Sequence, residues 1–312
     1  MVPFCEIPAG RVTPRSLQAT LRTMGYVLVR GLLPQRDVRR VLDDICRIMA
    51  AAGWLMPGSD PLERLANPAA ACGDPDPAFK QTYQKVFNLA SLHALPHHPA
   101  LLLAMRMIVG PRVLVHPKPI GRLIFPNCER LQVHAHQDYR FMLGDPECFT
   151  VWIPLHDCPL EVGPLQIMEG SHYLGFLSHD EENLHVPELP ESITAGGTWA
   201  GGQMAAGDAL IFHSFTVHAA LPNVSSQMRI SLDCRFQDYE RVIHPANLAF
   251  AGESVKSWEK TYSEWPADDL KFYWKKLPLR FRPSKAELEE LSLHAGSATV
   301  RAKSAKILSQ LI

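Results

Sequence analysis

The sequence predicts a mainly β protein with flanking helices. Between about Arg112 and Gln237, short apolar or alternating runs are separated by Pro, Gly and Asn, which is typical of an antiparallel sandwich or barrel. Helical periodicity precedes this region and returns after it. At 312 residues, 46% of them hydrophobic, the chain can bury a sizeable core. We expect one domain over residues 1–312, with a mainly helical N-terminal part (1–111), the β core (112–240) and a C-terminal helical extension (241–312).

Three helices and one strand are predicted before the β core. Residues 16–24 have helical spacing that Gly25 ends, and residues 26–30 form a short β-rich run. A third segment, Pro99–Val109, is expected to be helical. The segment Pro57–Pro77 is rich in Pro, Gly, Asp and Ala without periodicity, which indicates a loop. Another helix is predicted after Pro34, because apolar residues recur at helical intervals at Val38, Val41, Leu42, Ile45 and Met49.

The strands of the β core are short runs between turn residues. After the core, three tryptophans lie among charged residues, and we expect them to pack the extension against the core. Ser284–His294 has the pattern of a capped helix. The strands are predicted at Val113–His116, Arg122–Phe125, Gln132–His136, Phe149–Pro154, Leu165–Met168, Ala209–Phe212, Thr216–Ala220 and Arg229–Phe236.

Composition narrows the class of partner. The 31 basic and 32 acidic residues give a net charge of -1, so no overall basic character favours nucleic acid or an anionic membrane surface. No stretch approaches the roughly 20 apolar residues of a membrane helix, and the first residues lack the order of a signal peptide. The cysteines form no C-x-x-C pair, which favours reduced thiols. We therefore expect a cytoplasmic protein whose partner is a small molecule, with the oligomeric state left open.

A histidine and an aspartate two positions apart are the first candidates for chemistry. If residues 132–138 are extended, alternate side chains share one face of the strand. His136 and Asp138 could then reach one metal ion. An H-x-D pair of this kind arises often by chance, so by itself it is a weak signal.

Four neighbours of this pair are candidates for contact with a bound molecule. Gln132 would point inward with His136, where its amide could donate a hydrogen bond to a co-substrate or substrate. His134 shares the same predicted face and could line a pocket. Tyr139 and Arg140 follow the aspartate directly and are candidates for contact with substrate.

A second histidine and an arginine follow later in the β core. His218 lies on a predicted strand, and the turn signal Pro222-Asn223 comes after it. Arg229 follows His218 by 11 positions. If the turn reverses the chain, the two residues lie roughly opposite one another on neighbouring antiparallel strands. This arrangement would place a fixed cation near the metal.

Two imidazoles and one carboxylate form the facial triad of non-haem iron(II) oxygenases, which leaves coordination positions open. A nearby arginine offers the planar donor pair that a carboxylate accepts, so it suits a dicarboxylate co-substrate. Zinc in the same ligands is a poorer interpretation, because hydrolytic zinc more often uses three histidines or a His-Glu set. A metal binder without oxidative activity remains an alternative, although it needs no carboxylate clamp beside its ion.

The chain resembles the phytanoyl-CoA dioxygenase family of iron(II)- and 2-oxoglutarate-dependent oxygenases over about residues 16–240. The matching motifs agree in order and flanking sequence, and one departure is the family's frequent P-G-S-H, which here has Glu169 in place of Pro. The matches are the opening G-Y-V-L-V-R-G-L-L, the H-Q-D at 136–138, the V-W-I-P-L around Trp152, the V-G-P-L-Q-I-M-E-G-S-H at 162–172 and the G-D...H-x10-R block at 207–229.

The resemblance implies a fold, a set of ligands and a reaction class. The core would be a double-stranded β-helix, the cupin-like jelly-roll. His136, Asp138 and His218 would bind Fe(II), and Arg229 would pair with the distal carboxylate of 2-oxoglutarate. Trp152 would form a wall of the co-substrate pocket. Oxygen would be the second co-substrate.

The expected reaction is hydroxylation, or a related oxidation, of an unactivated C–H bond in a small organic molecule, with release of succinate and CO2. Halogenating relatives have a small residue at the acidic ligand position, so the retained Asp138 favours hydroxylation. We expect the substrate to be a biosynthetic or natural-product intermediate. A non-oxidative metal-binding jelly-roll, a sensor or an epimerase-like protein, is the alternative, because fold does not dictate function.

Overall fold

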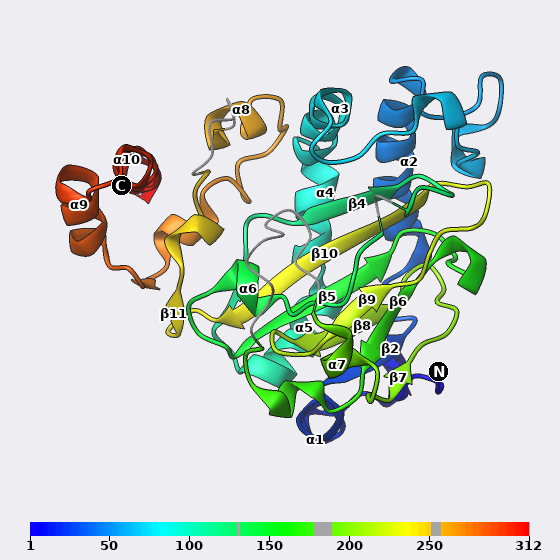
Figure 1. Ribbon diagram of the computed structural model, residues 1–312, viewed down its shortest axis with the longest axis horizontal. Coiled ribbons are helices and arrows are strands. Elements are labelled where there is room, and N and C mark those ends of the chain that lie inside the picture. Colours follow the sequence, from blue (N-terminus) through cyan, green and yellow to red (C-terminus); the bar gives the residue numbers. More distant parts are fainter. Residues whose placement is uncertain (130–131, 178–188, 251–256, 312) are drawn as a thin grey trace.

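A seven-stranded sheet forms the larger layer of the protein (Figure 1). The computed structural model describes residues 1–129, 132–177, 189–250 and 257–311. Most neighbouring strands are antiparallel, and β4 (Ile120–Ile124) pairs with the same strand as β3 does. The order across the sheet is β1 (Glu6–Pro8), β2 (Tyr26–Arg30), β8 (Ala209–His213), β5 (Cys148–Pro154), β10 (Arg229–Asp238) and β3 (Val113–Val115).

A smaller sheet completes a jelly-roll core. Its strands are β7 (Trp199–Ala200), β6 (Leu165–Met168) and β9 (His218–Ala220), paired antiparallel in that order. Side chains of both sheets form one buried cluster, in which Trp152 and Leu210 come from the large sheet and Leu165 and Ile167 from the small one. The interior between the two sheets is therefore partly apolar. The candidate site lies in the part of this interior that also contains polar side chains.

Helices cover the other face of the large sheet. The strand β10 shows why, since Ile230, Leu232, Cys234 and Phe236 alternate along it and pack into the cluster that also contains helix residues such as Ile45. The helices that contribute to this layer are α1 (Pro14–Met24), α2 (Gln35–Ala51), α3 (Pro77–Phe87), α4 (Ala90–Ala94) and α5 (Pro99–Val109). The predicted fold class, mainly β with flanking helices, is confirmed.

The predicted N-terminal elements agree closely with the structure. The first helix begins after a capping box formed by Thr13 and Ser16, and it ends at Gly25, which has φ +81°. The loop Pro57–Pro77 contains two short 3-10 turns, Pro61–Glu63 and Pro68–Ala70. The helices α3 and α4 were not predicted, and α4 has only five residues.

One predicted strand is wrong. Within Gln132–His136 only His136 makes a β-bridge, and the backbone amide of Gln132 donates to the carbonyl of Glu129. The chain then enters the short helix α6 (Tyr139–Met142) directly after Asp138. A short run of alternating polar and apolar residues can match the β pattern in sequence and still stay irregular in structure when it has no regular partner strand.

The C-terminal residues pack around aromatic side chains, as predicted for the tryptophans. Trp258, Trp265 and Trp274 are buried in one cluster with Phe87 of α3. No helix among the described residues is long and apolar enough to cross a membrane. The elements not yet given are α7 (Glu191–Thr194), β11 (Val242–Ile243), α8 (Trp258–Tyr262), β12 (Arg280–Phe281), α9 (Lys285–His294) and α10 (Ala298–Leu311).

We predict that Gly207→Ala lowers the free energy of unfolding by about 2–4 kcal/mol, from left-handed backbone strain plus a steric clash. Gly207 has φ +93°, and an added Cβ would lie 2.3 Å from the carbonyl oxygen of Leu33. The control is Gly31→Ala, because Gly31 has φ +63° but open space around its Cβ position. Urea unfolding should show a loss of only about 1 kcal/mol for the control. Equal losses in the two variants would contradict the steric argument.

Candidate active site

Three side chains that suit a metal ion converge between the two sheets. The ligand atoms of His136, Asp138 and His218 all lie within 4.8 Å of one another, and all three residues are buried. The carboxylate oxygen Oδ1 of Asp138 is 3.8 Å from Nε2 of His136 and 3.9 Å from Nε2 of His218. The structure thus brings together the three residues that the sequence nominated from separate motifs.

Backbone pairing explains why the two histidines meet. His136 and His218 are partners in an antiparallel bridge, and each backbone amide donates to the other's carbonyl at 3.0 Å. Directly opposite residues on such a pair project to the same side. Their ring centroids are accordingly 4.2 Å apart.

Asp138 reaches the histidines by a turn rather than by strand alternation. Its backbone is helical, with φ -64° and ψ -27°, and it directly precedes α6. The backbone amides of Phe141 and Met142 donate to its carbonyl. The sequence-based reason for placing Asp138 beside His136, an extended chain through residue 138, was therefore wrong, although the two side chains do converge.

Both imidazoles present Nε2 to the centre of the group. Nδ1 of His136 lies 2.7 Å from the carbonyl oxygen of His134, and Nδ1 of His218 lies 3.0 Å from that of Thr216. A carbonyl can only accept, so each Nδ1 carries the proton and each Nε2 keeps its lone pair. Burial lowers the pKa of His136 to about 3 and also lowers that of His218, which favours neutral imidazoles.

The carboxylate of Asp138 is held in its ionised form. Burial by itself would raise its pKa, but the guanidinium of Arg235 and the hydroxyl of Thr150 together hold the pKa below its ordinary value. The hydroxyl of Thr150 donates to Oδ2 at 2.5 Å, and Nη2 of Arg235 lies 3.2 Å from the same oxygen. Two neutral imidazoles and one carboxylate are the donor set that suits Fe(II).

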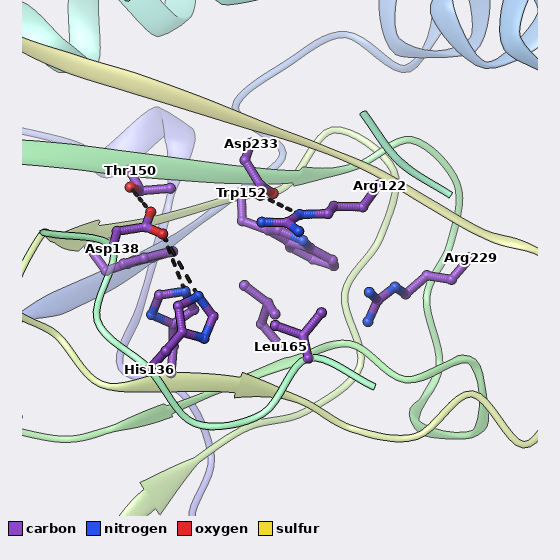
Figure 2. Close-up of a pocket in the computed structure, with 11 residues that line it drawn as sticks. Arg122, His136, Asp138, Thr150, Trp152, Leu165, Arg229 and Asp233 are labelled. Atoms are coloured by element: carbon purple, nitrogen blue, oxygen red, sulfur yellow. Dashed lines mark hydrogen bonds and ion pairs between the residues drawn. The ribbon is translucent and has the colours of Figure 1, made fainter. Parts of the chain in front are cut away.

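A cavity extends from this group to Arg229. Figure 2 shows His136 and Asp138 at one side of the cavity and Arg229 at the other, with Trp152 and Leu165 between them. Arg229 is 2% exposed, and its Nη1 donates to the carbonyl oxygen of Gly163. Burial lowers the pKa of Arg229 to about 10, so the guanidinium stays charged at neutral pH.

Charged residues missed in the sequence also face this interior. Arg122 and Asp233 line the cavity, and Nε of Arg122 donates to Oδ2 of Asp233 at 2.8 Å. From Arg229 to Gln237 of β10, polar residues alternate with the apolar ones that face the helices, and all of these polar residues are buried. This alternation is visible in the sequence and could have predicted the polar interior, since polar or charged residues at every second position of a buried strand share one face. The polar positions are Arg229, Ser231, Asp233, Arg235 and Gln237.

The other nominated residues lie outside the cavity lining. Gln132 and His134 are half-buried, and neither lines the cavity. Tyr139 instead packs against Phe176 and Phe215, with ring centroids 5.3 and 4.8 Å away, and its hydroxyl donates to the carbonyl oxygen of Gly144. Arg140 is half-buried and likewise does not line the cavity. The predicted position of Trp152 in a cavity wall agrees with the structure, where it is 1% exposed.

Gln137, which the sequence did not single out, joins the loops around the site. Its side chain is fully buried, and its amide nitrogen donates to the carbonyl oxygens of Gly175 and Phe215 at 2.8 and 2.7 Å. Its amide oxygen accepts from the backbone of Leu177 at 2.8 Å. Gln137 therefore ties the segment that carries His136 and Asp138 to two other loops.

Comparison with known proteins places this geometry in a family. The sequence model of the phytanoyl-CoA dioxygenase family (PhyH) matches residues 21–231. The chain belongs to this family. With its His-Asp-His group, the protein is an iron(II)- and 2-oxoglutarate-dependent oxygenase of this family. The division of the chain into residues 1–111, 112–240 and 241–312 of one domain stays a prediction.

Curated relatives include two enzymes from Streptomyces. The 1-deoxypentalenic acid 11-beta-hydroxylase of Streptomyces arenae is 28% identical over 236 residues, which cover 68% of this chain and 77% of the relative. The enzyme of the same name from Streptomyces exfoliatus is 27% identical over 228 residues, with the same coverage.

Solved structures share the fold. The epimerase SnoN, crystallised with Fe3+, alpha ketoglutarate and nogalamycin RO, superimposes with a TM-score of 0.56 at 21% identity and covers 78% of this chain and 91% of its own. The alpha ketoglutarate dependent carbocyclase SnoK from nogalamycin biosynthesis has a TM-score of 0.51 at 20% identity, covering 75% and 87%. These likenesses confirm the jelly-roll core.

We predict that Asp138→Asn weakens metal binding by on the order of 100-fold or more, because an amide replaces the anionic ligand. The measurement is an anaerobic calorimetric titration with Fe(II), or with Ni(II) as a stable substitute. Asp145→Asn is the control, since Asp145 pairs with Arg241 at 3.0 Å rather than with the histidines. Wild-type affinity in Asp138→Asn, with an unchanged circular dichroism spectrum, would refute the assignment of this ligand.

Proposed function

We propose that the protein hydroxylates an unactivated C–H bond of a small, largely apolar biosynthetic intermediate, with release of succinate and CO2. His136, Asp138 and His218 would hold the iron, and Arg229 would bind the distal carboxylate of 2-oxoglutarate. The observation that carries the proposal is the buried guanidinium of Arg229 across a cavity from the three candidate ligands.

The buried guanidinium of Arg229 has no anionic partner among the described residues. No carboxylate of the described residues lies within ion-pair distance of it, and its Nε is buried without a hydrogen-bond partner. A buried, unpaired charge is costly, so the site favours a ligand with a carboxylate at this position. The hydroxyl of Ser231, two residues along the same strand face, is also buried without a partner and could donate to the same carboxylate.

The remaining cavity residues suit oxidative chemistry. Bound iron would supply open coordination positions at which 2-oxoglutarate and oxygen react. The side chains of Trp152, Leu165 and Phe212 give the cavity apolar walls, which exclude water from the space between the metal ligands and Arg229. The hydrogen bonds of the two Nδ1 atoms to backbone carbonyls keep both imidazoles oriented.

The surface next to the candidate ligands favours an apolar substrate. Phe141 is 52% exposed, and its ring lies edge-on to His136 with centroids 6.0 Å apart. Phe176, 49% exposed, packs on Tyr139 in the same region. Exposed aromatic side chains beside a buried polar site are typical of ligand-binding surfaces. The relatives from Streptomyces, named for a hydroxylation of 1-deoxypentalenic acid, agree with such a substrate.

The alternatives account for fewer features. A metal binder without oxidative activity has no use for Arg229, and a zinc hydrolase more often uses three histidines or a His-Glu set. The retained acidic ligand, Asp138, favours hydroxylation over halogenation. Two measurements test the proposal: anaerobic addition of Fe(II) and 2-oxoglutarate, which should give the weak visible band of the chelate, and oxygen-dependent formation of succinate. A folded protein that gives neither result is not this kind of enzyme.

We predict that Arg229→Met raises the KM for 2-oxoglutarate by roughly 30- to 1000-fold, because a buried charge-assisted pair is worth about 2–4 kcal/mol. Arg241→Met is the control, since Arg241 is 45% exposed and pairs with Asp145. Metal affinity without 2-oxoglutarate should be unchanged in both variants. An unaltered KM in Arg229→Met would place the co-substrate elsewhere.

We also predict that Phe141→Ala raises the KM for an apolar substrate by about 10-fold, in line with the loss of one to two kcal/mol of apolar contact. With 1-deoxypentalenic acid as the first probe, the readout is the probe-dependent increase in oxygen consumption. The KM for 2-oxoglutarate should not change. Leu293→Ala, on the 64% exposed Leu293 of α9, is the control. Substrate responses that are equal in Phe141→Ala and wild type would remove Phe141 from the substrate surface.

A further inference from the structure

Arg235 makes an unusual contact with the candidate ligand Asp138. It lies on β10, is 5% exposed, and its Cα is paired with that of Thr150 on β5. Its Nη2 atom lies 3.3 Å from Oδ1 and 3.2 Å from Oδ2 of Asp138. A single nitrogen is thus nearly equidistant from the two carboxylate oxygens.

This position is the one that a metal would take if Asp138 were a bidentate ligand. A metal ion that is bound by both oxygens of a carboxylate must lie between them, at similar distances from both. Here Nη2 of Arg235 already lies between them. The two histidines instead approach Oδ1, with Nε2 atoms 3.8 and 3.9 Å away.

Neighbouring groups hold both side chains in place. The hydroxyl of Thr150 also donates to Oδ2 of Asp138, so this oxygen accepts from both Thr150 and Arg235. The same Nη2 atom of Arg235 lies 4.0 Å from Oδ2 of Asp233, and Nε of Arg122 donates to that oxygen at 2.8 Å. These buried charges alternate in sign and compensate one another, which holds the guanidinium of Arg235 beside Asp138.

We infer that Arg235 is a positioning residue that keeps Asp138 monodentate. The inference rests on the proposed function, in which this group holds iron. An octahedral ion bound by two imidazoles and one carboxylate oxygen has three open positions, of which 2-oxoglutarate needs two and oxygen needs the third. A bidentate Asp138 would occupy that third position. Arg235 therefore preserves the position at which oxygen reacts, without contacting the metal or the co-substrate.

Counting metal-bound water tests this role without turnover. The probe is Mn(II), which is paramagnetic and prefers octahedral oxygen and nitrogen ligands, and bound D2O is counted by electron spin echo modulation. Wild type and the control Arg241→Met should each show three bound waters, whereas Arg235→Met should show two. Thr150→Val, which removes a donor from Oδ2 but leaves Arg235, should retain three. With 2-oxoglutarate added, wild type should keep one water and Arg235→Met none.

Three waters in Arg235→Met would overturn the inference, and so would two waters in Thr150→Val. If Arg235→Met does not fold, a crystal structure of the wild-type Mn(II) complex decides: Asp138 bound through Oδ1 alone, with Nη2 of Arg235 still between its oxygens, supports the role, and a bidentate Asp138 refutes it. Failure of wild type to bind Mn(II) would contradict the proposed metal centre itself, which distinguishes the two failures.

Discussion

The burial of a polar strand face between two sheets is the constraint on which the structure depends. One side of β10 packs on helices through Ile230, Leu232, Cys234 and Phe236, and the other side carries charge into the interior. Such a face is stable only if each charge meets a partner or a ligand. Arg235 meets Asp138, and Asp233 meets Arg122. The candidate metal ligands are thus part of the same electrostatic arrangement that allows the strand to be buried.

Local patterns were enough to predict the fold class and the residues that could act on a metal. Turn residues cut the sequence into short runs, so β5, β6, β8 and β10 were located within one or two residues. The order of the motifs and the spacing between His218 and Arg229 indicated the family. These features depend on residues close in the chain, or on strand periodicity, which sequence reasoning can follow.

The partners of those residues could not be predicted, because they depend on register between distant strands. Thr150 lies opposite Arg235 only because β5 pairs with β10 in one alignment, and Arg122 meets Asp233 only because β4 pairs with β10 in one alignment. A shift of one residue would turn each side chain to the opposite face. The irregular path from Gln132 to Asp138 was missed for a related reason, since its conformation is set by tertiary hydrogen bonds such as those of Gln137.

If Arg229 binds 2-oxoglutarate as proposed, its buried guanidinium links the supply of co-substrate to the folding equilibrium. In the protein without co-substrate, no carboxylate of the described residues pairs with this buried cation, which lowers the free energy of unfolding. A dicarboxylate that binds the native chain and not the unfolded chain raises the free energy of unfolding again by mass action. The lifetime of the protein against unfolding and proteolysis would then follow the concentration of a central metabolite, independently of how fast the enzyme turns over.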